Sequence, residues 1–355
     1  MRAAALLLLS LLLLAAPGTS SRAAPCADVP SSRVVEIDAS SGPLFGDITK
    51  HEKEPSFLHP KEVVLTFDDG PMPWVTRSIL DTLDRFCAKA TFFAVGRMAV
   101  AYPDTLREIT NRGHTLGGHT WSHPLNLRRL KPDKALDEIE RGFAAIALAN
   151  RDGVAPFFRF PGLSDSAPLL AALQRRGIAT FTVDVVSDDS YIADHRRLAD
   201  LTLRRIEARG GGIVLFHDIK PATAKALPVI LAALKERGYS IVHIRAKARL
   251  DVLADYEPAL APQIAKNRAP ANGKARLMPF YGTIGPERVA FVEDAVPPSP
   301  VTALSPPPRE RLTAKSPAPE AKKPKSGASS TTVRTSVPAA GTAAAGWATR
   351  VEPSD

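Results

Sequence analysis

Between residues 60 and 245 the chain alternates short apolar runs with longer stretches whose apolar residues recur at helical spacing. The apolar runs predict strands and the periodic stretches predict helices. In chain order, the expected strands cover 63–67, 90–95, 115–120 (a strand that passes into a loop), 157–160, 179–183, 212–218 and 240–244. The expected helices cover 74–86, 103–111, 133–148, 167–176, 196–208 and 222–237. Repeated strand–helix units with short connections predict parallel strands with helices packed outside them. About seven such units favour an α/β barrel over an open sheet.

The two ends of the chain differ from this central part. Residues 1–24 have an Arg near the start, a leucine-rich run and then small residues, which is typical of a signal peptide. The apolar run 3–16 is short for a membrane span, so we expect an exported protein, periplasmic or secreted, without stable membrane insertion. Residues 25–59 form a lead-in to a domain at 60–248. Residues 249–355, rich in Pro, Ala, Ser and Lys, are expected to be disordered.

The net charge of +9 does not indicate nucleic-acid binding. Residues 260–355 hold 13 Lys and Arg against 7 Asp and Glu, so most of the positive charge lies in the tail. A basic tail suits contact with an anionic cell-wall polymer, although a solvated spacer has the same composition. The sequence has two cysteines, Cys26 and Cys87. We expect no bridge between them, because one lies in the lead-in and the other in a helix-like stretch.

Ionisable residues follow nearly every expected strand. They are Asp68 and Asp69, His119 and His123, Arg159, the carboxylates between Asp184 and Asp189, and His217 with Asp218. The carboxyl ends of parallel strands meet on one side of a barrel, where such folds carry their active sites. The pattern therefore predicts an active site at this end of the sheet.

The two histidines of "HTWSH" are four residues apart, a spacing that brings both rings to one side of a helix or a tight turn. The adjacent charges of Asp68 and Asp69 are unfavourable without a nearby cation. Two imidazoles and one carboxylate with an open position form a catalytic divalent-metal site. We therefore predict one divalent ion, most plausibly Zn²⁺, with Co²⁺ and Ni²⁺ as alternatives.

The remaining polar residues suggest a division of roles. One carboxylate of the Asp pair ligates the metal, and the other stays unligated and takes a proton from a water that the metal activates. Arg159 is placed to orient that carboxylate, and His217 to protonate a leaving group while a carboxylate of the 184–189 loop holds its tautomer. Four further residues are expected to have packing or capping roles: Asp184, Asp218, His114 and His243.

Four motifs resemble those of the polysaccharide deacetylase family (carbohydrate esterase family 4): "TFDDGP" at 66–71, "HTWSHP" at 119–124, "RFPG" at 159–162 and "LFHD" at 215–218. The resemblance covers about residues 60–245 and implies a distorted (β/α) barrel with about seven strands. It also implies these roles: Asp68 as the base, Asp69, His119 and His123 as metal ligands, Arg159 as the residue that orients Asp68, His217 as the general acid, the backbone amide near Gly162 as an oxyanion donor, and Leu215 as part of the acetyl pocket.

One motif departs from the family pattern, in which an Asp is followed by a Trp. This chain has "SDDSY", which matches Asp189 to the Asp that partners His217, with Asp188 as the alternative, and leaves Ser190 in the place of the Trp. We expect the loss of the indole to change how a sugar or acetyl group packs, without affecting the metal site. Gly162 stands where many relatives carry an aromatic residue, which is expected to open the substrate groove.

The motifs together predict a metal-dependent hydrolase that removes N-acetyl groups from a polysaccharide containing N-acetylglucosamine. Peptidoglycan, chitin-like oligomers and poly-N-acetylglucosamine are all open as substrates, as is an acetyl ester on a xylan-type polymer. Two other classes also stay open: a non-catalytic glycan-binding protein of the same fold, and a cell-wall attachment factor that acts through the basic tail. The intact set of base, ligands and acid favours the enzyme, because binding alone needs no general acid.

Overall fold

The computed structural model describes residues 33–268, 280–283 and 288–291. The predicted signal peptide and most of the predicted tail lie outside the described residues. The strands are β1 (Val34–Ile37), β2 (Leu44–Phe45), β3 (Glu62–Asp68), β4 (Thr91–Ala94), β5 (Thr115–Gly118), β6 (Phe157–Phe158), β7 (Ala179–Phe181), β8 (Val185–Val186), β9 (Gly212–His217), β10 (Ser240–Ile241), β11 (His243–Ala246), β12 (Phe280–Thr283) and β13 (Arg288–Phe291). The helices are α1 (Pro73–Arg85), α2 (Gly96–Ala101), α3 (Pro103–Asn111), α4 (Pro132–Asn150), α5 (Ala167–Arg175), α6 (His195–Arg209), α7 (Pro221–Glu236) and α8 (Glu257–Asn267).

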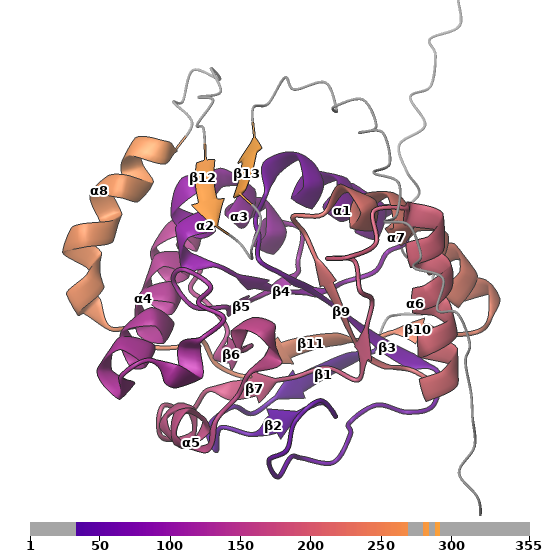
Figure 1. The fold of residues 1–355 in the computed structure, drawn as a ribbon, viewed down its shortest axis with the longest axis horizontal. Helices are drawn as coiled ribbons and strands as arrows, with labels where there is room; N and C mark the ends of the chain where they lie inside the picture. The colour runs from indigo at the N-terminus through magenta and orange to yellow at the C-terminus, as the bar shows by residue number, and fades with distance from the viewer. Residues whose placement is uncertain (1–32, 269–279, 284–287, 292–355) are drawn as a thin grey trace, which may run out of the picture. The chain divides into compact units, whose positions relative to one another are not determined.

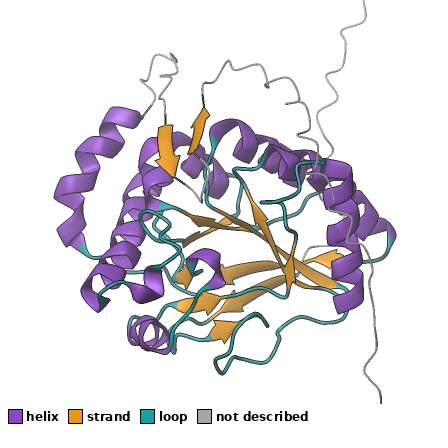
Figure 2. Ribbon diagram, in the orientation of Figure 1, coloured by secondary structure: helices purple, strands orange, loops and turns teal. Residues whose placement is uncertain are grey.

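The main sheet has the strand order β2-β7-β6-β5-β4-β3-β9-β8, and β10 pairs with the beginning of β3 (Figure 1). All of its strand pairs are parallel. β1 and β11 form a separate parallel pair, and β12 and β13 an antiparallel pair. Within residues 33–268 the helices lie around the strands (Figure 2). The predicted α/β fold with a parallel, barrel-like sheet is confirmed.

The sheet curls because a short connection joins its two ends. β7 is the second strand from one end and β8 is the last strand at the other end, yet only residues 182–184 separate them. The four residue steps from Phe181 to Val185 span at most about 14 Å. Six strand spacings in a flat sheet would place the two strands about 29 Å apart. The two ends must therefore approach each other.

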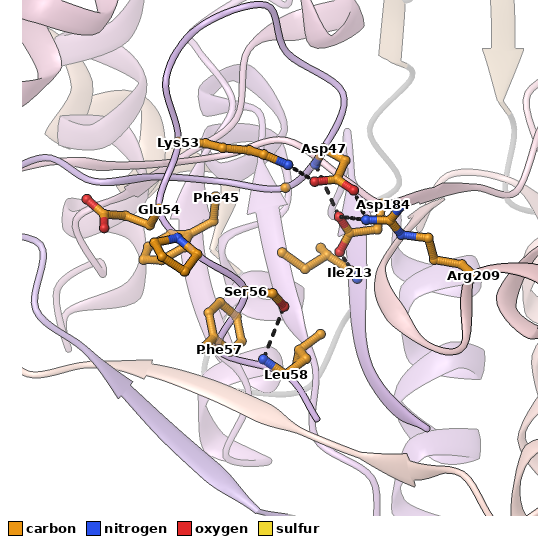
Figure 3. Close-up of a pocket in the computed structure, with 12 residues that line it drawn as sticks. Phe45, Asp47, Lys53, Glu54, Ser56, Phe57, Leu58, Asp184, Arg209 and Ile213 are labelled. Atoms are coloured by element: carbon orange, nitrogen blue, oxygen red, sulfur yellow. Dashed lines mark hydrogen bonds and ion pairs between the residues drawn. The ribbon is translucent and has the colours of Figure 1, made fainter. Parts of the chain in front are cut away.

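Residues 182–184 form a seam that bonds to both ends of the curled sheet. On one side, the Thr182 N–H donates to the Phe45 carbonyl at the end of β2 (2.8 Å). On the other side, the Asp184 N–H donates to the Ile213 carbonyl of β9 (2.9 Å). The Asp184 carboxylate accepts hydrogen bonds from the Asp47 N–H (3.1 Å) and the Ile213 N–H (2.8 Å), so one side chain joins both ends (Figure 3).

β3 shows how the sheet presents polar residues to the inside of the curl. Its residues Val63, Leu65 and Phe67 belong to the apolar cluster that includes the helices, whereas Val64 belongs to a second cluster built mainly from strand residues. Successive side chains of a strand point to opposite faces. Asp68 therefore lies on the same inner face as Val64, at the carboxyl end of the strand.

The segment 257–267 corrects the prediction that disorder begins at residue 249. It forms helix α8, which packs against α4 and α2. Leu260 and Ile264 lie one helical turn apart and are buried, and the Asn267 side-chain amide donates to the Val100 carbonyl (2.9 Å). Two apolar residues at helical spacing are thus enough to hold this segment to the domain, despite its otherwise polar composition.

The expectation about the cysteines is also wrong, because Cys87 is disulfide-bonded. Cys26, the other cysteine of the sequence, lies outside the described residues. The expectation took the stretch around Cys87 as helix-like, although the expected helix itself ended at residue 86. The structure ends α1 at Arg85, and Cys87 follows in a turn with a φ of 53°.

Among the described residues, no helix has the length and apolar character needed to cross a membrane.

We predict that Asp184→Ala lowers the free energy of unfolding by about 1 to 3 kcal/mol, because the Ile213 N–H loses this acceptor and the Asp47 N–H keeps only the Val183 carbonyl. Urea unfolding followed by circular dichroism measures this change. Asp200→Ala is the matched control, since Asp200 is exposed and, within the described part of the chain, forms an ion pair with Arg204 alone, one turn along α6. Equal stabilities of the two variants would show that the seam does not depend on Asp184.

Candidate metal centre and active site

The end of β3 presents two neighbouring carboxylates to one site. Asp68 is the last residue of the strand and points inward. Asp69 has a φ of 79°, a left-handed conformation that turns the chain and breaks the alternation of the strand. Both side chains are buried, with exposures of 3% and 4%. The backbone turn thus allows adjacent residues to face the same place.

The second contributor is the loop that follows β5. His119 and His123 lie in a non-helical turn in which Thr120 and His123 have positive φ values of 67° and 59°. The His123 N–H donates to the Thr120 hydroxyl oxygen (3.0 Å), which closes the turn. Glu138 of α4 accepts hydrogen bonds from the Ser122 N–H and hydroxyl, both at 2.8 Å. These hydrogen bonds anchor the loop to the long helix α4. The centroids of the His119 and His123 rings lie 4.8 Å apart.

Asp69, His119 and His123 form the cluster with metal-ligand geometry among the described residues. The Asp69 Oδ1 lies 3.2 Å from His123 Nε2 and 3.5 Å from His119 Nε2. This oxygen is buried and has no hydrogen-bond partner, which is costly unless a cation satisfies it. The site therefore fits a divalent ion.

The protonation state of His119 also suits a ligand. Its Nδ1–H donates to the Arg159 carbonyl (2.7 Å), which leaves the lone pair of Nε2 directed at the cluster. Burial lowers the pKa of His119 to about 4, although the charge of Asp68 opposes this shift. The imidazole is thus neutral near pH 7, as metal binding requires.

Arg159 is fully buried and connects this cluster to the rest of the barrel. Its Nη1 donates to Asp68 Oδ1 (2.8 Å) and to the Thr66 hydroxyl (2.7 Å). Its other nitrogens donate to the carbonyls of Phe181 (3.1 Å) and Thr182 (3.2 Å). Each nitrogen of the guanidinium group thus donates to an acceptor, and the Asp68 carboxylate is held in one orientation.

His217 stands opposite Asp68, since the two residues are directly paired in the β3–β9 ladder. Its Nδ1–H donates to Asp189 Oδ1 (2.7 Å), and its Nε2 lies 3.9 Å from Asp69 Oδ2. Burial disfavours the charged imidazolium, but the carboxylates of Asp189 and Asp69 outweigh burial and raise the pKa of His217 to about 10. His217 therefore holds a proton at the site.

The structure distinguishes the three carboxylates that the sequence left open as partners of His217. Asp189 also accepts from the His217 N–H (2.7 Å) and the Thr223 hydroxyl (2.6 Å). Asp188 instead pairs with Arg205 of α6 (2.7 Å). Asp184 belongs to the seam. Of these three carboxylates, Asp189 is thus the one that is hydrogen-bonded to His217.

Asp218, expected to be structural, supports the turn that carries Asp69. Its carboxylate accepts from the Gly70 N–H (2.9 Å) and the Thr76 hydroxyl (2.7 Å). Burial, with a further contribution from the charge of Asp69, raises the pKa of Asp218 to about 7. A side chain at Gly70 would collide with the Asp218 carboxylate, so the close approach requires glycine.

The two predicted substrate-binding residues lie at the margin of this cluster. Gly162 is exposed in a turn with a φ of 60°, beside Leu125 of the histidine loop. Leu215 of β9 is buried with the inner apolar cluster and pairs with Thr66 in the sheet. Their assigned contacts with substrate stay predictions.

Three supporting residues were not identified from the sequence: Thr66, Glu138 and Thr223. Thr66 lies within "TFDDGP", and its position two residues before Asp68 on the same strand face could have indicated its role. Glu138 and Thr223 carry no local signal, because each reaches a loop far away in the chain.

The curled parallel sheet and the cluster at its carboxyl edge define a (β/α)-barrel protein with an Asp–His–His site suited to one divalent ion. Residues 58–181 match the family model described as polysaccharide deacetylase. The chain is 31% identical over 195 residues to the chitooligosaccharide deacetylase of Bradyrhizobium sp. (strain ANU 289), in an alignment that covers 51% of this chain and 88% of that protein. The chain belongs to the polysaccharide deacetylase family.

Two further similar proteins have cell-wall names. The peptidoglycan-N-acetylmuramic acid deacetylase PdaC of Bacillus subtilis (strain 168) is 33% identical over 184 residues, covering 52% of this chain and only 38% of that protein. The solved structure of a Bdellovibrio bacteriovorus peptidoglycan deacetylase superposes with a TM-score of 0.54 at 34% identity, covering 61% of this chain and 59% of that one. The match thus spans less than two thirds of either relative.

We predict that the protein, freed of metal by a chelator, binds one Zn²⁺ ion per chain in a calorimetric titration. His119→Ala, His123→Ala and Asp69→Asn should each weaken this binding by more than about 100-fold, the upper end of what the loss of a merely supporting residue costs. His195→Ala, at the beginning of α6, is the control and should bind normally. Full-affinity binding by all three variants would place the ion elsewhere.

Proposed function

We propose that the protein is a metal-dependent hydrolase that removes N-acetyl groups from a polysaccharide containing N-acetylglucosamine. The observation that carries this proposal is the different surroundings of two adjacent carboxylates. Asp69 faces two imidazoles, whereas Asp68 is held by Arg159. A proton-bearing His217 stands across from both. One ligand, one base and one acid are the set that amide hydrolysis requires.

In this proposal Asp69, His119 and His123 hold the ion, most plausibly Zn²⁺, with Co²⁺ and Ni²⁺ as alternatives. The ion supplies Lewis acidity for the acetyl carbonyl and for the attacking water. Asp68 accepts the proton of the attacking water, and Arg159 fixes the carboxylate in position for that transfer. The guanidinium itself stays buried and makes no contact with substrate.

His217 donates a proton to the departing sugar nitrogen. Asp189 holds the Nδ1–H tautomer, so that Nε2 faces the site. The backbone amide near Gly162 serves as a donor to the developing oxyanion, and Leu215 lines the space for the acetyl methyl group. The family membership supports these assignments, and the positions of the strand ends make them geometrically coherent.

The substrate is a β-linked N-acetylated polymer, with peptidoglycan first because two of the similar proteins carry that name. Chitin-like oligomers come next, from the name of the Bradyrhizobium relative. Large exposed apolar residues follow the strand ends: Trp74 at the beginning of α1, Leu125 in the loop after β5, and Tyr191 in the loop after β8. Such side chains suit contact with the faces of sugar rings. We further propose that the protein is exported, as the pattern of residues 1–24 indicates.

The proposal is tested by acetate release from peptidoglycan and from N-acetylglucosamine oligomers of several lengths. A chelator should abolish release and Zn²⁺ should restore it. Asp68→Asn should lower turnover by at least about 100-fold while Zn²⁺ binding persists, because it removes only the base. Asp188→Asn makes the same substitution at a carboxylate that pairs with Arg205, and it should keep normal turnover.

If Zn²⁺ binds but no amide or ester substrate releases acetate, a non-catalytic glycan-binding role replaces the enzyme. Deletion of residues 269–355, which leaves α8 intact, tests the third reading, since an enzyme should keep its turnover on soluble oligomers without the tail. Loss of that turnover would favour a role that depends on the tail.

The pH dependence should report the contact between His217 and Asp189. The charge of Asp189 raises the pKa of His217, so Asp189→Asn lowers that pKa and the acid form is lost at lower pH. The alkaline limb of the pH profile of kcat/KM should therefore shift to lower pH by about one unit or more. Asp188→Asn should leave the limb in place. An unchanged limb in Asp189→Asn would mean that His217 is not the acid.

A further inference from the structure

A second cavity, of about 760 Å³, lies at the opposite end of the sheet from the metal cluster. It is lined by the residues that begin β5 (113–116), by the segment before β6 (152–155), and by β11 with the residues after it (243–249). Because β5 runs from this cavity to His119, the two sites occupy opposite ends of the same strand. No residue of the proposed catalytic set lines it.

The cavity is lined by four cationic side chains and one acidic one. The cations are Lys89, Arg245, Lys247 and Arg249, and the acid is Asp152. Lys247 pairs with Asp38 (3.3 Å), and Lys89 lies 3.9 Å from Asp84. Arg245 and Arg249 have no acidic partner among the residues that the structure describes.

Two glycines leave room for two of the cationic side chains at the cavity, Lys89 and Arg249. Gly113 and Gly153 have φ values of 79° and 80°. A Cβ at Gly113 would lie 3.8 Å from Lys89 Nζ, and one at Gly153 would lie 3.0 Å from Arg249 Cδ. The two long side chains therefore cross directly over exposed backbone, which limits where their charges can go.

Two buried, neutral histidines also line the cavity. Thr115 donates to the Ile244 carbonyl (2.8 Å), so its hydroxyl oxygen accepts from His243 Nε2 (2.9 Å). The Ala90 N–H donates to His114 Nδ1 (3.2 Å), which places the His114 proton on Nε2, a buried nitrogen with no hydrogen-bond partner.

The charges that face these histidines are all positive. Burial lowers the pKa of His114 to about 3, and Lys89 and Arg112 lower it further. Burial likewise lowers the pKa of His243 to about 4, with contributions from Arg245 and Lys89. Arg112 is itself paired with Asp81 and Asp84. The cations lining the cavity outnumber its single carboxylate, Asp152, which favours a positive potential there.

We propose that this cavity binds the phosphate group of a small molecule or polymer. Two guanidinium groups of the segment 243–249, which have no acidic partner among the described residues, and the Lys89 ammonium group from before β4 suit an anion with several acceptor oxygens and up to two negative charges. This describes phosphate better than a carboxylate. The volume exceeds the needs of a free phosphate, so the cavity also holds part of the molecule that carries it.

The test is a calorimetric titration of the Zn²⁺-loaded mature protein with inorganic phosphate and, separately, with glucose 6-phosphate, at an ionic strength held constant with chloride. We expect saturable binding of both, tighter for the sugar phosphate. The imidazole NMR signals of His114 and His243 should shift as the site fills.

The double variant Arg245→Gln/Arg249→Gln should weaken binding at least about tenfold. Arg197→Gln, an exposed arginine on α6, is the control and should change it by less than about twofold. Absence of saturable binding to the native protein would overturn the proposal. So would equal affinity in the double variant, which would place the phosphate elsewhere, for example at the metal. Acetate release by the double variant should match that of the native protein, so the outcome is independent of the proposed hydrolase activity.

Discussion

The buried guanidinium of Arg159 is the interaction on which the site depends. A charge without solvent is unfavourable unless it is paired and hydrogen-bonded, and here every guanidinium nitrogen donates, to Asp68, Thr66 and the carbonyls of residues 181 and 182. The carbonyl of Arg159 itself accepts from His119. One residue thus fixes the orientation of the proposed base, the tautomer of a proposed ligand, and the position of both relative to the seam that closes the sheet.

Much of the site could be predicted from the sequence because its residues occupy strand ends. The carboxyl ends of parallel strands lie on one side of a sheet. The sequence alone therefore predicts that four residues lie close together: Asp68, His119, Arg159 and His217. The carboxylate that partners His217 could not be chosen from the fold alone, because a shift of one residue in the 184–189 loop changes which carboxylate faces it. Only the resemblance to a family favoured Asp189, because alternation in an irregular loop carries no reliable period.

The features that escaped sequence analysis involve contacts between distant segments. Glu138 fastens the histidine loop from a helix, and α8 is held by two apolar residues within a polar stretch. The disulfide at Cys87 was missed because nothing in the local sequence around this turn residue indicates a partner distant in the chain. In each case local composition points to one environment and tertiary packing supplies another. The central residues of helices and strands could be predicted, whereas their ends and the side-chain contacts between distant segments could not.

The direct pairing of Asp68 with His217 has a consequence for how such a protein can diversify. Neighbouring strands lie about 4.8 Å apart, and the backbone ladder sets that spacing whatever the side chains around it. Shifting one residue past the other would require a register slip, which would turn every inner side chain of β3 outward. The separation of the proposed acid and base is therefore set by the main chain, whereas exposed positions of the loops after β5 and β8 that hold neither a proposed ligand nor a partner of His217, such as Leu125 and Tyr191, lie outside this constraint.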